Sequence, residues 1–120
     1  MTTNRRGFLR LKTRVNLVYG VLGTKQSGIA LTDDLSESGV RFVAEHVLEK
    51  GSPLQLSLRL PDRQAPVQVM GIVTWAVSRT STDKLRPGKV SEVGVQFVEM
   101  SVEDRQWLRQ YTKLNALPTE

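Results

Sequence analysis

The sequence predicts an all-β domain that is followed by one C-terminal helix. Up to about residue 100, short runs alternate apolar and polar side chains, which is the pattern of strands with one buried face. Beyond that point the apolar spacing changes to that of a helical stripe. Roughly six short strands before one amphipathic helix favour a closed or sandwiched antiparallel sheet, with the helix against an open end or a flank.

The first half of the chain predicts three strands. Apolar side chains alternate along the first and the third, at Val15, Leu17, Tyr19 and Val21, then at Val40, Phe42 and Ala44. The second strand is expected over residues 29–34, between a turn at 23–28 and a tight turn at 36–39. In the tight turn we expect Gly39 to use the positive φ that glycine adopts without steric cost.

The second half predicts one helical turn and three further strands. The helical turn covers residues 45–50 and is ended by Gly51 and Pro53. A polar loop covers residues 78–90, and Gly71 in mid-strand predicts a bulge or a bend. The alternating positions are Leu54, Leu56, Leu58 and Leu60, then Val67, Val69, Gly71, Val73, Trp75 and Val77, and finally Val93, Val95 and Phe97.

The C-terminal helix has a start signal and an apolar stripe. Ser101 and Asp104 resemble a capping box with aspartate in the usual glutamate place, and Pro118 is expected to end the helix. The stripe consists of Trp107, Leu108, Tyr111 and Leu114. We expect Trp107 to pack the helix onto the sheet.

Composition excludes several classes of function. The chain has no cysteine and one histidine, His46, so disulfides, thiolate metal sites and a zinc site are not expected. We find no nucleophile–base pair and no phosphate-cradling glycine-rich loop, which argues against an enzyme. No apolar run approaches the ~20 residues that span a bilayer, and no apolar segment follows the basic N-terminus as in a secretory signal. We therefore expect a cytoplasmic protein without membrane insertion.

Two segments carry the candidate binding chemistry. Residues 1–32 hold six basic side chains before the first acid, Asp33, and such an arm attracts phosphates. Within it, Arg6 and Arg10 could converge on one anion, because each guanidinium offers a planar donor fork. In the second segment, residues 34–39, Asp34 can accept hydrogen bonds from a guanine and Ser36 can donate to a phosphate. Gly39 would allow close backbone approach or hold the turn.

Both segments resemble the PilZ domain family, whose pattern is RxxxR in an N-terminal loop and (D/N)xSxxG at a strand turn. Arg6 and Arg10 match the first motif, and Asp34, Ser36 and Gly39 match the second. The similarity extends over roughly residues 5–114, through the segments 40–42, 71–75 and 93–97 and the helix that follows. Two motifs in this order on this strand pattern are more specific than either motif alone.

The resemblance implies a six-stranded antiparallel β-barrel that binds cyclic di-GMP on its outer surface. The arginine loop would close over the ligand, with no cofactor besides it. In the family, the residue before RxxxR influences whether one nucleotide or an intercalated pair binds, and here that residue is Arg5. We accordingly divide the chain into a flexible basic arm over 1–12, a barrel over 13–100 and a C-terminal amphipathic helix packed on the barrel over 101–116.

Each candidate site residue could also have a role in which it does not contact a ligand. The three arginines could form a solvated basic arm, and Asp34 and Ser36 could be ordinary turn formers. Arg41 could reach the ligand or be an exposed strand arginine. Trp75 shares the predicted face of Val73 and Val77, so core packing is the default and a place at the edge of the ligand site is the alternative.

Three functions remain open from the sequence. The first is a cyclic di-GMP receptor, in which the ligand orders the arginine loop and alters a surface that engages a downstream protein. The second is a PilZ-like adaptor that contacts other proteins without a ligand. The third is a small nucleic-acid-binding barrel, against which the aromatic content of only 6% argues, because such barrels stack bases on exposed aromatic side chains. The pathway, ligand stoichiometry and oligomeric state are not predicted.

Overall fold

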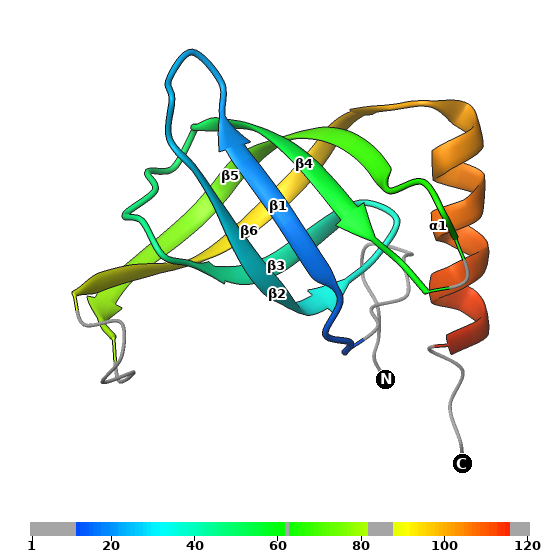
Figure 1. The fold of residues 1–120 in the computed structure, drawn as a ribbon, viewed down its shortest axis with the longest axis horizontal. Helices are drawn as coiled ribbons and strands as arrows, with labels where there is room; N and C mark the ends of the chain where they lie inside the picture. The colour runs from blue at the N-terminus through cyan, green and yellow to red at the C-terminus, as the bar shows by residue number, and fades with distance from the viewer. Residues whose placement is uncertain (1–11, 62, 82–87, 116–120) are drawn as a thin grey trace, which may run out of the picture.

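Six antiparallel strands close into a barrel in a computed structural model that describes residues 12–61, 63–81 and 88–115 (Figure 1). Around the barrel the strands follow the order β1-β2-β3-β6-β5-β4, so the first strand pairs with both β2 and β4. The predicted six-stranded antiparallel barrel with a C-terminal helix is therefore confirmed. The elements are β1 (Asn16–Val21), β2 (Ser27–Leu35), β3 (Gly39–Ala44), β4 (Pro53–Arg59), β5 (Val67–Thr80), β6 (Lys89–Met100) and α1 (Val102–Asn115).

The barrel interior is filled by the alternating side chains of all six strands. Tyr19 and Phe42 are the largest of these, are fully buried, and pack with ring centroids 5.5 Å apart. Burial raises the pKa of Tyr19 to about 12. The phenol oxygen lies 2.7 Å from Nδ1 of His46. The single histidine, to which the sequence assigned no role, thus has a partner inside the fold.

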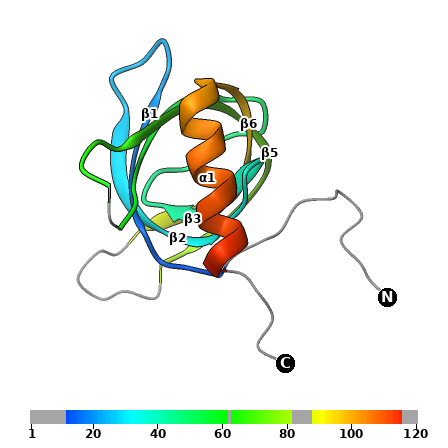
Figure 2. The same cartoon turned by 90° about the vertical axis from the view of Figure 1, so that its right-hand side faces the viewer.

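Helix α1 lies across one open end of the barrel (Figure 2). Leu108 is fully buried beneath it, whereas Leu114 is 70% exposed, so the predicted apolar stripe ends before Leu114. The predicted cap is present, because Ser101 Oγ accepts a hydrogen bond from the Asp104 amide at 3.0 Å. The Asp104 carboxylate pairs with Arg63, whose guanidinium lies 5.5 Å from the centre of the Trp107 ring. These contacts fasten α1 to the β4–β5 connection.

Two predicted segments differ from the structure. Residues 45–50 form no helical turn, because their backbone bonds elsewhere: the Leu48 amide donates to Ser91 Oγ at 2.8 Å, and Leu48 is buried. The predicted loop over residues 78–90 is shorter, because β5 continues to Thr80 and pairs with Lys89 at the start of β6. This end of the β5–β6 ribbon is largely exposed, and a ribbon without a buried face needs no apolar alternation, so the sequence pattern does not reveal it.

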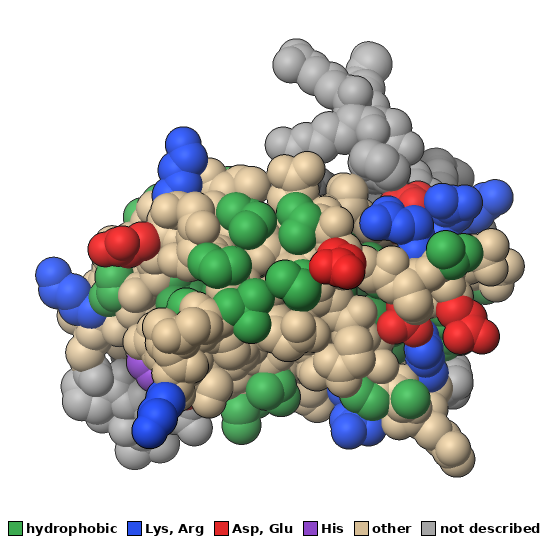
Figure 3. Space-filling view, turned by 90° about the horizontal axis from the view of Figure 1, so that it is seen from above, with side chains coloured by type: hydrophobic (Ala, Val, Ile, Leu, Met, Phe, Trp, Pro, Cys, Tyr) green, Lys and Arg blue, Asp and Glu red, His purple; other side chains and the backbone are tan. Residues whose placement is uncertain are grey.

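Most of the outer face is polar, yet several large hydrophobic side chains are exposed. Figure 3 shows hydrophobic side chains gathered in the middle of one face, with one acidic side chain beside them and most other charged side chains toward the margins. Exposed examples on the strands include Val18, Ile29, Leu31, Val77 and Val98. Separately, no helix in the described parts of the chain is long and apolar enough to cross a membrane.

Candidate functional site

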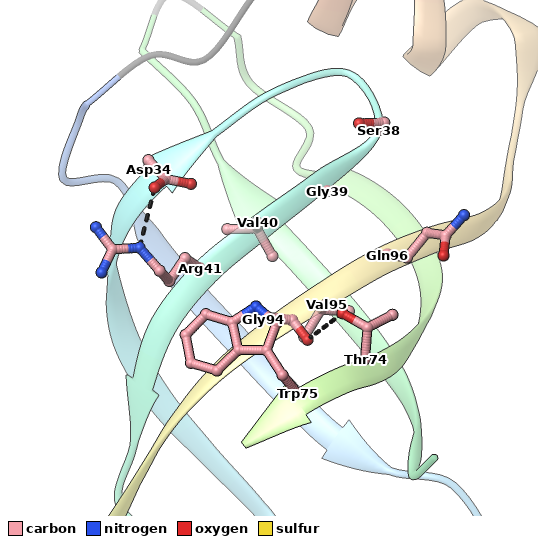
Figure 4. Close-up of a pocket in the computed structure, with 10 residues that line it drawn as sticks. All are labelled: Asp34, Ser38, Gly39, Val40, Arg41, Thr74, Trp75, Gly94, Val95 and Gln96. Carbon is pink, nitrogen blue, oxygen red and sulfur yellow. Dashed lines mark hydrogen bonds and ion pairs between the residues drawn. The ribbon is translucent and has the colours of Figure 1, made fainter. Parts of the chain in front are cut away.

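A hollow of about 650 Å³ with both polar and apolar lining lies on the outer face of the barrel, where β3, β6 and β5 run side by side (Figure 4). Residues of β2, the β2–β3 turn, β3, β5 and β6 line it. Its lining includes Asp34, Ser38, Gly39, Arg41, Thr74, Trp75, Gly94 and Gln96. The structure therefore brings Asp34, Gly39, Arg41 and Trp75, all singled out from the sequence, to one place.

Asp34 and Arg41 form a charged pair at one side of the hollow. A register shift in the β2–β3 ladder sets Asp34 opposite Arg41, and Arg41 Nε donates to Asp34 Oδ2 at 3.0 Å. Arg41 Nη1 donates to Glu92 Oε2 at 2.8 Å, so the guanidinium bridges three strands. The hydrogen bond to Asp34 raises the pKa of Arg41.

Glu92 was missed by the sequence interpretation, because it belongs to no motif. It lies on β6, 51 residues from Arg41, and becomes its neighbour only through the register of the β3–β6 ladder. Strand register is set by the three-dimensional pairing, so a single sequence offers no direct signal for such a partner.

The β2–β3 turn is shaped by Ser36. Its hydroxyl is the acceptor for the amides of Ser38 at 3.1 Å and Gly39 at 3.2 Å, and the Ser36 amide donates to the Gly39 carbonyl at 2.9 Å. Ser36 is only 1% exposed, whereas Ser38 lines the hollow. The structure thus gives Ser36 the turn-forming contacts and places a second hydroxyl residue, Ser38, which the sequence interpretation did not select, at the hollow.

Gly39 allows strands β3 and β6 to approach closely, and it does not adopt a left-handed turn conformation. It is absent from the described glycines with positive φ, which are Gly23, Gly51 and Gly88, so the expectation of positive φ was wrong. A Cβ atom at Gly39 would lie 2.5 Å from the carbonyl oxygen of Val95 on β6. Glycine is therefore needed because β3 and β6 run too close together here for any side chain.

Trp75 lies in the hollow and not in the core, so the default interpretation of core packing was wrong. A register shift in the β5–β6 ladder between Val73 and Trp75 breaks the alternation, leaving Val73 fully buried and Trp75 40% exposed. The indole lies against Gly94, where a Cβ atom would overlap its Nε1 (Figure 4). The result is an aromatic surface set into the wall of the hollow.

The arginines of the basic arm, Arg5, Arg6 and Arg10, lie outside the described residues, so their place beside the hollow stays a prediction. Within the described residues, no group of three or more histidine, cysteine, aspartate or glutamate side chains could hold a metal ion. What the described hollow offers is a carboxylate acceptor, a cation, hydroxyl groups and an aromatic face, which suit a ligand with both hydrogen-bond donors and planar rings.

The fold and this site define a small closed β-barrel domain with a hollow on its outside. The model of the PilZ domain family matches residues 4–114, and the chain belongs to that family. No curated protein sequence matches the chain.

Several solved structures share this fold at low sequence identity. The PilZ domain of YcgR from Escherichia coli, solved with c-di-GMP, has a TM-score of 0.69 at 14% identity, with 93% of this chain and 92% of that chain covered. The Bacillus subtilis inhibitor of motility MotI (DgrA) has a TM-score of 0.72 at 19% identity, covering 93% of this chain and 51% of that one. MrkH of K. pneumonia has a TM-score of 0.72 at 14% identity, covering 96% and 50%. This chain thus spans about half the length of MotI and MrkH.

Proposed function

We propose that this PilZ domain is a cytoplasmic receptor for cyclic di-GMP, which it binds without converting it. The observation that carries the proposal is the convergence of Asp34, Gly39, Arg41 and Trp75 on one external hollow. The ligand named in the structures of the YcgR PilZ domain and of MrkH, c-di-GMP, supports the same choice.

The chemistry of the ligand fits the hollow group by group. A guanine edge presents N–H donors, and the Asp34 carboxylate is an acceptor that β2 and β3 hold in position. The flat face of the base suits the exposed indole of Trp75. In this proposal Ser38 donates a hydrogen bond to the ligand, Ser36 keeps the turn in shape, and Arg41 holds the Asp34 carboxylate in position.

The remaining phosphate contacts are assigned to the basic arm. Arg6 and Arg10 would close over the ligand, and Arg5 would supply a further cation for an intercalated pair of nucleotides. Ordering of the arm would change the outer surface and so engage a downstream protein. The hydrophobic side chains gathered in Figure 3 are a candidate contact surface for that protein.

Isothermal titration calorimetry of the wild-type chain with cyclic di-GMP tests the proposal. We expect saturable heat at micromolar concentrations, with two nucleotides per chain if a pair binds and one in the Arg5→Ala variant. Each of Arg6→Ala and Arg10→Ala should weaken binding strongly. Folded wild-type protein that gives no heat would overturn the receptor function and leave the ligand-independent adaptor as the better proposal.

Trp75→Ala should weaken cyclic di-GMP binding by roughly tenfold, because stacking of one base on an aromatic side chain contributes about 1–3 kcal/mol. The matched control is Val77→Ala on the same strand, which removes a side chain that is 56% exposed and does not line the hollow. Calorimetry should show unchanged affinity for the control. Equal affinity of the Trp75→Ala variant and the wild type would exclude stacking on this indole.

A further inference from the structure

An ion pair joins the turn of the candidate site to helix α1. Arg109 Nε on α1 donates to Glu37 Oε1 at 3.0 Å, across 72 residues of sequence. Glu37 lies in the β2–β3 turn between Ser36, which shapes the turn, and Ser38, which lines the hollow. The turn and the helix lie side by side in both views of the fold (Figures 1 and 2).

The two partners differ in their exposure to water. The Glu37 side chain is 15% exposed, whereas the Arg109 side chain is 57% exposed. A carboxylate that is largely withdrawn from water has few water molecules to stabilise its charge, so it depends on a counter-charge. An exposed arginine has no comparable need for its partner.

The turn does not need Arg109 for its shape. Besides the bonds made by Ser36, the Phe97 amide donates to the Ser38 carbonyl at 2.8 Å, which fixes the turn to β6. Every one of these bonds is made within the turn or to the barrel. Because the geometry is set without the helix, the contribution of Arg109 is one of charge.

The charge matters because of where Glu37 lies. Glu37 directly precedes Ser38, which lines the hollow, and their Cα atoms are ~3.8 Å apart. The Glu37 carboxylate therefore lies within about one screening length of the hollow, which is ~10 Å at about 0.1 M salt. An unpaired carboxylate there would repel a ligand that carries phosphates. We propose that Arg109 supports binding of the phosphate-bearing ligand without touching it, by neutralising Glu37 at the edge of the hollow. This inference rests on the proposed function.

A double-mutant cycle tests the inference by calorimetry with cyclic di-GMP. In about 0.1 M salt, Arg109→Ala should weaken binding about fivefold, while the Glu37→Gln, Arg109→Ala double variant should return to near wild-type affinity. Glu37→Gln alone should bind as well as the wild type. In about 1 M salt the deficit of Arg109→Ala should disappear, because the screening length falls to ~3 Å.

Arg105→Ala is the matched control. Arg105 lies one turn earlier on α1 and carries the same charge, so its loss reproduces any general effect of a less basic helix. Its affinity should be unchanged. Wild-type affinity in Arg109→Ala would overturn the inference alone, and so would a Glu37→Gln variant as weak as Arg109→Ala, since that would indicate a tether. A wild type that does not bind would overturn the proposed function and this inference with it.

Discussion

Asp34→Ala should weaken cyclic di-GMP binding by at least about 100-fold, which corresponds to the loss of roughly 3 kcal/mol from two hydrogen bonds to a charged acceptor. Asp34 is 7% exposed and is held in place by Arg41, so it is in position before the ligand arrives. The barrel should tolerate the change, because Arg41 keeps its bond to Glu92 at 2.8 Å. Calorimetry gives the affinity, and thermal unfolding shows whether the variant is folded.

The neighbouring carboxylate supplies the control for this change. Asp33 precedes Asp34 on β2 but lines a different hollow, together with residues such as Ile29 and His46. Asp33→Ala removes the same charge at almost the same place and should leave the affinity nearly unchanged. If both variants lose binding equally, the effect is one of general charge, and Asp34 has no specific contact with the ligand.

Gly39→Ala should lower both stability and affinity, since one added methyl group has no room. Its Cβ would meet the Val95 carbonyl oxygen at 2.5 Å, and backbone cannot rotate away as a side chain can. Forcing β3 from β6 should cost about 3 kcal/mol of unfolding free energy, at the upper end of typical overpacking penalties. For a domain of this size that lowers the melting temperature by roughly 10 °C. Differential scanning calorimetry measures the shift, and ligand titration measures the loss of binding.

Gly20→Ala tests whether the effect belongs to Gly39 or to any strand glycine. Gly20 lies in β1, and a Cβ there would meet nothing within 4 Å. Alanine in this strand should leave the melting temperature unchanged or raise it slightly, because it reduces the conformational freedom of the unfolded chain. A Gly39→Ala variant as stable as Gly20→Ala would contradict the close approach of β3 and β6.

Local pattern was sufficient to predict the strands and a closed or sandwiched sheet, and the resemblance to the PilZ family specified the barrel, but neither predicted the details of its outer wall. Residues such as Leu54, Leu56 and Leu58 occupy alternate positions, and all three are buried. Only one face of their strand can therefore point into the core. Trp75 was misassigned because a register shift reverses the alternation in mid-strand, and no residue type marks that shift in one sequence.

Some residues of the candidate site could likewise be predicted from local sequence, and others could not. Asp34 and Gly39 belong to a local motif, so the sequence could point to them. Glu92 and Arg109 reach the site only through strand register and helix docking, over separations of 51 and 72 residues. Local spacing has no information about such pairs. The roles of Arg5, Arg6 and Arg10 remain predictions from the motif.

Because the hollow lies on the outside of the barrel, the residues that shape the hollow are largely different from the residues that fill the core. Along β3, Phe42 is buried in the core and Arg41 lines the hollow, while Val40 is buried and also contributes to the lining of the hollow. A substitution at an outward-facing position such as Arg41 can therefore alter the hollow without changing the buried side chains of the interior. Proteins with only 14–19% identity can keep this barrel, with TM-scores near 0.7. Gly39 lines the hollow and also allows β3 to lie close to β6, so both the hollow and the packing depend on it. We expect its sequence position to change more slowly than its neighbours.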